Sequence, residues 1–305
     1  MMEGHEIDKW QQPDIADFVR QLVDKWGPEP HEYGKLTNLF DVLDAQRKSG
    51  LLHQDKLSVL WEMFGEAMTP KTMQGFVARK PHGYAGDYEV IDKIYTQKVS
   101  HDIRFSKWDF FFQGTSACRA VRNRKQYFIE LLAETVQKNE NTKILNVGSG
   151  PGRDVYDFFC LYPEAIVSID CIDLDVNAIA FSDTLCQDYK DRISFSNRNI
   201  FRFRTMKRYD LVWSAGLFDY LDDRLFKHLL THLYSLVAGN GQLVIGNFSE
   251  ANPSRAYMEF GEWLLLHRKS EKLKALAEEC GIDPNMIKVG SEPEGVNLFL
   301  HVEKS

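Results

Sequence analysis

The sequence predicts an α/β fold: a doubly wound, mostly parallel seven-stranded sheet with an antiparallel terminal hairpin, preceded by a helical N-terminal domain. Three observations support this prediction. Residues up to about Lys138 follow helical periodicity, short apolar runs alternate with helical segments from Lys143 onward, and the last two apolar runs are joined by a short turn. We therefore expect two domains, over residues 1–140 and 141–305.

The N-terminal domain is expected to consist of amphipathic helices. Apolar residues recur at i, i+3, i+4, i+7 and i+8 from Ile15 to Trp26, with Pro13 before them and Gly27-Pro28 after them. The same periodicity predicts helices over Leu36–Leu43, Leu57–Phe64 and, leading into the first strand, Ala117–Leu132.

The second domain alternates predicted strands and helices. Asp222 or Asp223 is expected to cap the third of these helices and Gly239 to end it, while Gly281 ends the fourth. A turn around Glu292–Gly295 makes the last two strands an antiparallel hairpin. The strands are expected at Ile144–Val147, Ile166–Ile172, Ile193–Ser196, Asp210–Ser214, Gln242–Phe248, Met286–Val289 and Val296–Val302, and the helices at Asp154–Cys160, Val176–Gln187, Arg224–Val237 and Lys272–Cys280.

Composition narrows the class of protein. With 305 residues, 44% of them hydrophobic and 27% charged, the chain can bury a large core. The net charge of -7 argues against a general binder of nucleic acid or of anionic membranes. Two basic runs, Arg119–Lys125 and Arg198–Arg208, are interpreted as solvated faces.

Cysteine usage and the lengths of the apolar runs indicate the compartment. The 5 cysteines are scattered without a C-x-x-C pair, so we expect neither a disulfide framework nor a metal site. No apolar run approaches the ~20 residues of a membrane span, and the N-terminus is charged where a signal peptide has its apolar core. We therefore expect a soluble cytoplasmic protein without a membrane partner.

The stretch Asn141–Asp157 is the strongest functional signal. A buried strand runs into Gly148, Ser149, Gly150 and Gly152, and a helix follows. Such a turn lets the backbone approach a ligand closely, and it serves dinucleotides, flavins and S-adenosyl compounds alike. The choice of ligand therefore depends on other residues.

The residues after the turn favour a ligand with a positive centre over a pyrophosphate. A G-x-G-x-x-G fingerprint needs its third glycine at the position that Arg153 occupies. Asp154 and Asp157 place negative charge in the first helical turn, where a phosphate would lie.

An acidic residue about 20 positions further on is expected to bind the ribose hydroxyls. We favour Asp173, which ends the second strand and precedes Leu174. The alternatives are Asp170, which lies within the strand, and Asp175, which is expected to cap the next helix.

Five segments resemble, in order, the motifs of the class I S-adenosylmethionine-dependent methyltransferases, which have a Rossmann-like fold: ILNVGSGPG, CIDLDVNAIAFS, RNIFRF, YDLVWSAGLFDYLDD and GNGQLVIGNF. The resemblance covers Lys143 to the C-terminus and implies S-adenosyl-L-methionine as the cofactor. It implies cofactor contacts at the glycine turn, at Asp173 and Leu174, at Asn199 and Ile200 for the adenine, and at Ser214, Ala215 and Gly216 for the methionine portion.

Methyl transfer from a sulfonium is an in-line displacement, so such an enzyme mainly positions donor and acceptor and excludes water. This chemistry requires neither a metal nor a covalent nucleophile. Aromatic side chains can lie against the sulfonium charge, and packing in the core or at the rim is the alternative for each of them. The candidates are Tyr84, Tyr88, Phe218 and Tyr220.

Lys80–Tyr95 is the second unusual stretch, because Gly83 and Gly86 bracket a turn rich in polar and aromatic residues. The functional interpretation makes this turn part of an active site, and the structural one makes it the start of a helix. In the first, His82, Asp87 and Tyr84 are catalytic and Tyr88 contacts the cofactor; in the second, Asp87 is the N-cap and Tyr88, Ile91 and Tyr95 form the buried stripe.

This stretch and FFQGTSACRAVRNRKQYF are similar to bacterial methyltransferases associated with making 3-hydroxypalmitic acid methyl ester, an extracellular factor. The similarity implies that the helical domain is a lid over the carboxyl edge of the sheet, where substrates bind in open α/β sheets. Arg122, and after it Arg119, is our candidate for binding the cofactor carboxylate or an acidic acceptor.

An alcohol or amine acceptor needs a general base, whereas a carboxylate needs none. The candidate bases are, in order, His82, Asp87, His101 and His267. The segment Asn247–His267 is expected to form the opposite wall of the acceptor site, with Asn252, Tyr257, Glu262 and Trp263.

We therefore expect a methyltransferase that acts on a carboxyl, hydroxyl or amino group of a small molecule in secondary or signalling metabolism, without a nucleic-acid partner. The oligomeric state stays open, with a homodimer as one option. The rival interpretations are a nicotinamide-dependent oxidoreductase and a catalytically silent cofactor-binding partner in a biosynthetic complex.

Overall fold

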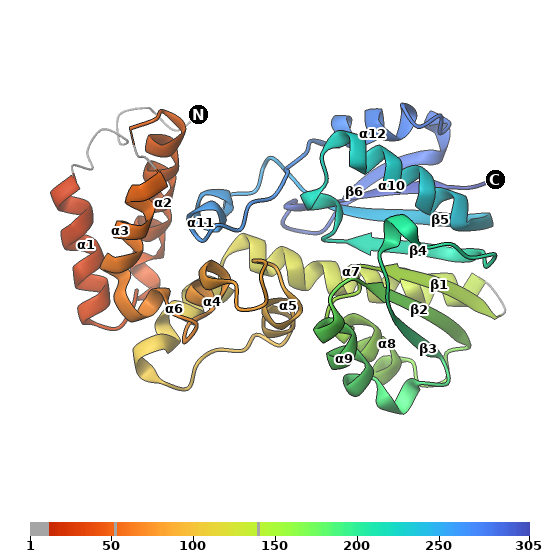
Figure 1. The fold of residues 1–305 in the computed structure, drawn as a ribbon, viewed down its shortest axis with the longest axis horizontal. Helices are drawn as coiled ribbons and strands as arrows, with labels where there is room; N and C mark the ends of the chain where they lie inside the picture. The colour runs from red at the N-terminus through yellow and green to blue at the C-terminus, as the bar shows by residue number, and fades with distance from the viewer. Residues whose placement is uncertain (1–11, 52–53, 139–140) are drawn as a thin grey trace. The chain divides into compact units, whose positions relative to one another are not determined.

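The computed structural model describes residues 12–51, 54–138 and 141–305 (Figure 1). The chain divides into two compact units, which we call the helical unit (Met1–Cys118 with Pro253–Leu264) and the sheet unit (Arg119–Asn252 with Leu265–Ser305). This division differs from the sequence-based one in two ways: the first boundary lies between Cys118 and Arg119 and not between residues 140 and 141, and the late segment Pro253–Leu264 belongs to the helical unit. Each unit is described by itself below.

The helical unit contains the helices expected near its start and several that periodicity did not predict. α6 has aromatic residues on more than one face, so it lacks a clear apolar stripe, and α4 and α11 are too short to show one. The helices are α1 (Gln12–Asp24), α2 (Tyr33–Lys48), α3 (Gln54–Phe64), α4 (Met73–Arg79), α5 (Tyr88–Tyr95), α6 (Ile103–Gln113) and α11 (Arg255–Phe260).

Aromatic packing explains why the late segment belongs to the helical unit. The ring of Phe40, on α2, lies 4.7 Å from that of Tyr257 and 4.8 Å from that of Phe260, both on α11. The indole of Trp61 donates a hydrogen bond to the Phe260 carbonyl at 3.1 Å. Each such aromatic pair contributes about 0.5–1.5 kcal/mol beyond the apolar area it buries.

The sheet unit is built on one sheet with the strand order β3-β2-β1-β4-β5-β7-β6. The first five strands of this order are parallel, and β7 is antiparallel to both of its neighbours. The fold class is therefore confirmed, including the terminal hairpin. The strands are β1 (Thr142–Val147), β2 (Val167–Asp173), β3 (Ile193–Asn197), β4 (Tyr209–Ala215), β5 (Val237–Phe248), β6 (Ile287–Ser291) and β7 (Asn297–Glu303).

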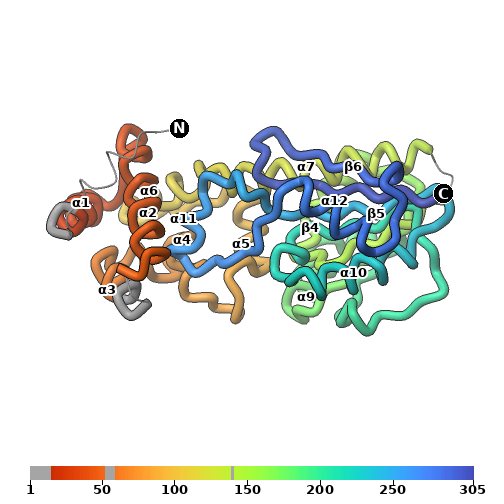
Figure 2. Tube along the Cα trace, turned by 90° about the horizontal axis from the view of Figure 1, so that it is seen from above, coloured from red at the N-terminus to blue at the C-terminus, as the bar shows by residue number. Residues whose placement is uncertain are grey.

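Alternation along the strands sends apolar side chains to two cores, one on each face. On β1, Ile144 packs into the core with α7 and α8, and its neighbour Leu145 packs into the core with α10 and α12. Figure 2 shows α7 and α10 on opposite sides of β4 and β5. The helices are α7 (Ser116–Lys138, in the sheet unit from Arg119 onward), α8 (Arg153–Leu161), α9 (Val176–Leu185), α10 (Asp223–Leu236) and α12 (Ser270–Glu278).

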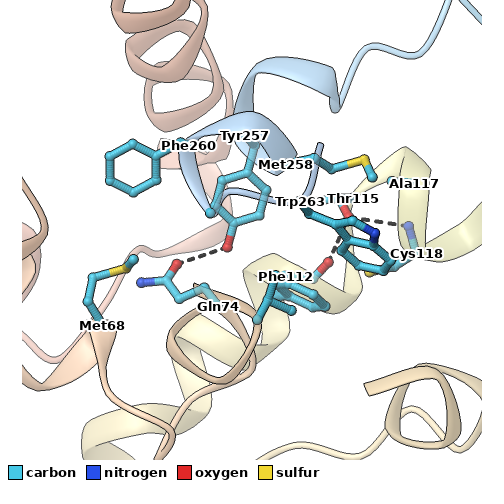
Figure 3. A pocket seen from close by; sticks show the side chains of 12 residues that line it. Met68, Gln74, Phe112, Thr115, Ala117, Cys118, Tyr257, Met258, Phe260 and Trp263 are labelled. Atoms are coloured by element: carbon cyan, nitrogen blue, oxygen red, sulfur yellow. Dashed lines mark hydrogen bonds between the residues drawn. The ribbon is translucent and has the colours of Figure 1, made fainter. Parts of the chain in front are cut away.

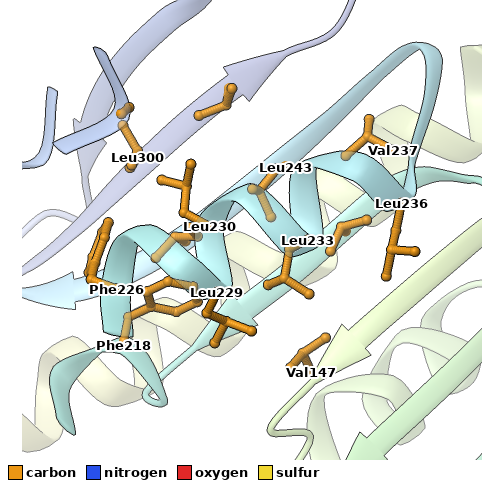
Figure 4. Packing of buried hydrophobic residues seen from close by; sticks show 14 of the residues in the cluster. Val147, Phe218, Phe226, Leu229, Leu230, Leu233, Leu236, Val237, Leu243 and Leu300 are labelled. Carbon is orange, nitrogen blue, oxygen red and sulfur yellow. The ribbon is translucent and has the colours of Figure 1, made fainter. Parts of the chain in front are cut away.

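α10 shows how the sequence pattern becomes packing. Apolar residues recur along it at helical spacing, and five of them are buried (Figure 4), whereas Leu225 on the outer side is 42% exposed. Burying each such side chain stabilises the fold by about 1.5–3 kcal/mol. The buried residues are Phe226, Leu229, Leu230, Leu233 and Leu236.

The end of α10 differs from the prediction. Asp222 caps the helix by accepting a hydrogen bond from the Leu225 amide, but the helix ends at Leu236 and not at Gly239. Val237 leaves the helix in an extended conformation and pairs with Tyr209 of β4.

Along the described ranges, no helix combines the length and apolar character needed to cross a bilayer.

Candidate functional site

The glycine turn follows β1 at the point where the strand order reverses. β1 lies between β2 and β4, so connections leave it in opposite directions, and ligands of open α/β sheets bind at such a switch point. Gly148 and Gly152 have φ of 66° and 64°, a conformation that residues with a Cβ rarely adopt. A Cβ at Gly152 would also lie 3.0 Å from that of Ser182 on α9.

Asp173 lies beside this turn and is held there by two backbone groups. Its Oδ2 accepts a hydrogen bond from the Gly150 amide and its Oδ1 one from the Asp175 amide, both at 2.9 Å. Burial raises the pKa of the carboxyl group, and these two hydrogen bonds oppose the shift. A carboxylate has further lone pairs, so Asp173 can still accept ribose hydroxyls. Leu174, the next residue, is exposed.

The two acidic alternatives have structural roles. Asp175 caps α9 by accepting a hydrogen bond from the Asn177 amide at 2.8 Å, as predicted. Asp170 lies within β2, where burial raises its pKa, but hydrogen bonds from Lys207 and Ser194 outweigh that effect and lower it. Of the three, Asp173 is the one beside the glycine turn.

The predicted adenine contacts lie just after β3. Asn199 Oδ1 accepts a hydrogen bond from the Phe201 amide at 2.9 Å and so caps the 3₁₀ turn Ile200–Arg202. The Ile200 side chain packs into the core that also contains Ile172 of β2. The local fold thus brings Asn199 and Ile200 to the same sheet edge as Asp173.

The end of β4 forms the other side of the switch point. Ser214 is fully buried and its hydroxyl donates to the Val147 carbonyl at 3.0 Å, which ties the ends of β4 and β1 together. Gly216 has φ of 104°, and a Cβ there would lie 3.2 Å from Arg124 Nη1. Ala215 lies between the two and is partly exposed.

Arg124, which the sequence did not single out, lies at this end of β4. Its guanidinium lies against Gly216 and the residue is buried, whereas the favoured Arg122 is half-buried. Arg119 donates two hydrogen bonds to the carboxylate of Glu294, at 2.9 and 2.8 Å. The sequence does indicate that Arg124 is buried, because it falls in the apolar stripe of α7, between Val121 and Phe128.

Two buried carboxyl groups accompany Arg124. Asp154, in the first turn of α8, accepts a hydrogen bond from the Val155 amide, and Asp219 accepts one from the Phe248 amide at 2.6 Å. Burial raises the pKa of each to about 6, and the charge of Arg124 opposes both shifts. Burial of Asp219 was not predicted.

Two buried polar atoms near the end of β1 have no hydrogen-bond partner among the described residues: Asn146 Nδ2, in the strand, and Ser149 Oγ, in the glycine turn. Buried polar atoms without partners are rare in folded proteins. A ligand with polar groups at this turn would satisfy them. Together with Asp173 and the close backbone approach at the glycines, they fit an adenosyl ligand that carries an amino-acid end.

The turn before α5, in the helical unit, carries the predicted catalytic residues. Asp87 caps α5 through Oδ1, which accepts from the Glu89 and Val90 amides at 2.9 and 3.0 Å, so the N-cap interpretation is confirmed. Its Oδ2 is buried without a hydrogen-bond partner in the described structure. His82 Nε2 lies 3.0 Å from Glu89 Oε2, and Tyr84 is exposed.

The buried stripe of α5 differs from the predicted one. Val90 and Ile94 are buried, whereas Tyr88, Ile91 and Tyr95 are partly exposed. Val90 and Ile94 are spaced i and i+4, so they lie on one face of the helix, and that face is the buried one.

Several other candidates lie in packed or hydrogen-bonded positions. Phe218 is fully buried against Phe226, with ring centroids 4.8 Å apart, while Tyr220 is 44% exposed. His267 has Nδ1 3.1 Å from the Leu265 carbonyl and Nε2 3.2 Å from Asn252 Nδ2, so both ring nitrogens are engaged.

Tyr257 and Trp263 line a small apolar cavity inside the helical unit (Figure 3). The Tyr257 hydroxyl donates to Gln74 Oε1 at 2.8 Å, so the polar groups at this wall satisfy each other. Glu262 is in an ion pair with Lys80 in the same unit. His101 is exposed.

The basic runs are engaged locally. Lys125 forms an ion pair with Asp157, Lys207 one with Asp170, and Arg208 donates to the Lys207 carbonyl at 2.9 Å. In the part of the chain that the structure describes, no group of His, Cys, Asp and Glu side chains has the arrangement of a metal site.

Comparison with known proteins places these features in context. No family model matches the chain. Over 136 residues it is 26% identical to malonyl-[acyl-carrier protein] O-methyltransferase 1 of Ilyobacter polytropus, a match that covers 45% of this chain and 47% of that protein. The matched region thus spans about half the length of this curated relative.

Two solved structures match the chain at low sequence identity. A protein of Bordetella parapertussis, described as a possible exported protein, matches with a TM-score of 0.60 at 16% identity, over 72% of this chain and 79% of that one. Magnesium protoporphyrin IX methyltransferase of Synechocystis PCC 6803, solved with S-adenosylhomocysteine, matches with a TM-score of 0.49 at 14% identity, over 63% and 89%. At these identities the Bordetella structure supports the fold and nothing finer.

Proposed function

We propose that this chain, whose sheet unit has the fold of the class I S-adenosylmethionine-dependent methyltransferases, transfers a methyl group from S-adenosylmethionine to a small-molecule acceptor. The strand order and the curated methyltransferase relative support the resemblance that the motifs of the sheet unit indicated. The reaction and its acceptor go beyond the fold, and they are proposed on the residues of the site.

The observation that carries the proposal is the position of Asp173. Its carboxylate is held by the amides of Gly150 and Asp175 at the switch point, where a ribose would lie beside the glycine turn. Asn146 Nδ2 and Ser149 Oγ, both buried without partners among the described residues, would hydrogen-bond the polar groups of the same ligand.

The bound cofactor would supply an activated methyl group on a positively charged sulfur. The residues of the chain hold the donor in place: Asp173 binds the ribose, Asn199 and Ile200 lie where the adenine is expected, and the glycines allow backbone contact. A fixed donor raises the rate of an in-line displacement by orienting the reacting atoms.

We propose oxygen as the acceptor atom, in a carboxyl or hydroxyl group of a small molecule of secondary or signalling metabolism. The curated relative is named for transfer to an oxygen, which favours this option over an amino group. A hydroxyl acceptor would need a base, for which His82 and Asp87 stay our first predictions, ahead of His101 and His267. The net charge of -7 disfavours a nucleic-acid acceptor.

Calorimetric titration with S-adenosylhomocysteine and with NADH tests the cofactor. We expect the thioether to bind, and Asp173→Asn to weaken it by about tenfold to a hundredfold, because a hydrogen bond to a charged group is lost. Asp183→Asn, which removes an exposed carboxylate on α9, is the matched control. Binding of NADH without binding of the thioether would overturn the proposal.

Incubation with S-adenosylmethionine and panels of carboxylic acids, alcohols and amines tests the reaction. Formation of S-adenosylhomocysteine that depends on an acid or alcohol is the expected result. Cofactor binding without turnover on any panel would favour the catalytically silent alternative.

A further inference from the structure

Three charged side chains are buried together in the sheet unit. Arg124, Asp154 and Asp219 are 5%, 7% and 1% exposed, and they come from α7, from the first turn of α8 and from the 3₁₀ turn Phe218–Tyr220. Charged groups are almost never this buried unless they are paired or functional. We call them the buried charge cluster.

The cluster is tied to both turns that flank the switch point. Asp154 follows the glycine turn by two residues, and Asp219 follows Gly216 by three. Arg124 Nη1 lies against the Cα of Gly216, where a Cβ would be 3.2 Å away. A ligand bound across these turns would therefore feel the net charge of the cluster, because water screens buried charges only weakly.

Other charged groups lie near these three residues. Asp173, whose pKa burial also raises, lies beside the glycine turn and adds to the negative charge there when it is ionised. Beside Asp154, Asp157 is in an ion pair with Lys125, and burial raises the pKa values of the Cys171 and Cys186 thiols, which stay neutral. Beside Asp219, Arg268 is held by Asn247 Oδ1 at 2.8 Å and by Asp223 at 3.0 Å.

The charge of the cluster therefore depends on pH. Burial raises the pKa of Asp154 and of Asp219 to about 6, with the charge of Arg124 opposing each shift. Well below this pH the arginine dominates and the cluster is positive. Well above it both carboxylates are ionised and the cluster carries an excess negative charge.

A second observation indicates that a ligand lies here. Ser149, inside the glycine turn, is 6% exposed, and its Oγ has no hydrogen-bond partner among the described residues. A hydroxyl buried in this way is costly unless a ligand satisfies it. We therefore interpret the glycine turn, which precedes Asp154, as a ligand-binding site.

We propose that Arg124, Asp154 and Asp219 determine specificity between the two forms of the cofactor, by favouring the positively charged sulfonium donor over the neutral thioether product. This inference rests on the proposed function. Donor and product differ by one methyl group and one positive charge, so a negative cluster attracts the sulfonium of the donor and adds no such attraction for the neutral sulfur of the product. In this proposal the sulfonium of the donor is the positive centre that the acidic first turn of α8, with Asp154, favours.

Calorimetric titrations of the full chain with S-adenosylmethionine and S-adenosylhomocysteine, from pH 5 to pH 8, test the inference without turnover. The ratio of the two dissociation constants isolates the sulfonium charge. We expect the preference for the donor to rise by about tenfold as the carboxylates ionise, because one unit of pKa coupling equals a tenfold change in affinity.

The variants separate charge from structure. Asp154→Asn and Asp219→Asn should each flatten the pH dependence, and exposed Asp183→Asn should leave it unchanged. Arg124→Gln should move the transition to higher pH, because the charge of Arg124 then no longer opposes protonation of the two carboxylates, and Arg124→Lys should restore it. Near-ultraviolet circular dichroism checks that each variant is folded.

The outcomes distinguish the two proposals. Binding of neither ligand at any pH would overturn the proposed function and this inference with it. Binding of both ligands with a ratio that is the same at pH 5 and pH 8 would overturn the inference alone. If an asparagine variant does not fold, the comparison of Arg124→Gln with Arg124→Lys decides.

Discussion

The sheet unit and the helical unit place their candidate site residues by different physical means. In the sheet unit, parallel strands bring Asp173, Ser214 and Gly216 to one edge, whatever the residues between them. In the helical unit, the turn at Asp87 is placed by a helix cap and by aromatic packing, which are local details. Site residues that the strand topology brings together can be predicted from the order of motifs in the sequence. Site residues that side-chain packing brings together can be identified only from the structure.

The largest expected effect tests whether aromatic packing holds the helical unit together. Phe40→Ala should reduce the free energy of unfolding by about 3–5 kcal/mol, because it leaves a cavity among four aromatic rings. Chemical denaturation measures this. Phe110→Ala on α6 is the matched control, since Phe110 is 56% exposed and its removal should cost about 0.5 kcal/mol or less. Equal effects would contradict the packing account.

The next effect tests the buried carboxyl groups of the sheet unit. Burial raises the pKa of Asp219 from 3.8 to about 6, so at intermediate pH the folded protein keeps a proton that the unfolded chain has released. Its contribution to stability is therefore complete at low pH and is lost as the pH rises through about 6. Asp219→Asn should remove about 2–3 kcal/mol of this pH dependence, as measured by denaturation at pH 4 and pH 8. An unchanged dependence would show that Asp219 does not titrate in this range.

A smaller effect tests the glycine turn. Gly152→Ala should reduce the free energy of unfolding by about 1–2 kcal/mol, because φ is 64° and the new Cβ would press on Ser182. It should also weaken binding of S-adenosylhomocysteine. Gly239→Ala is the control, since nothing lies within 4 Å of its Cβ position. Thermal melting and titration with S-adenosylhomocysteine are measured for both variants. If Gly152→Ala behaves like Gly239→Ala in both, the turn tolerates a side chain and the prediction is wrong.

The smallest effect separates the two interpretations of Asp87. Asp87→Ala should cost about 1 kcal/mol through loss of the α5 cap, and Asp87→Ser should restore stability, because serine also caps helices. If Asp87 is catalytic, Asp87→Ser should stay impaired in turnover while its melting temperature recovers. Recovery of both would leave Asp87 as a cap alone.

The sequence predicted the sheet unit well, because apolar runs, glycine turns and motif order report topology directly. Asp173 and Asp175 have the roles expected of strand-end and cap residues. Arg124 could not be assigned from the sequence, because a run of basic residues is usually a solvated face and only the fold shows Gly216 beside it. The end of α10 was misplaced because Val237 continues an apolar pattern into a strand.

The helical unit was predicted less completely. α6 carries aromatic residues around much of its surface, so neither its periodicity nor its inner face could be read from the sequence. The membership of the segment with Tyr257 and Phe260 depends on ring contacts with Phe40, which is more than 200 residues away in the chain. His82, Tyr84 and Asp87 stay predictions for catalysis.

The late segment Pro253–Leu264 has a consequence for the order of events during synthesis. The helical unit is complete only when this segment has left the ribosome, after the first five strands have been made. Until then the ring of Phe40 lacks two of its partners, so a fragment that ends before Pro253 exposes an aromatic surface. Nascent or truncated chains should therefore aggregate more readily than the full chain.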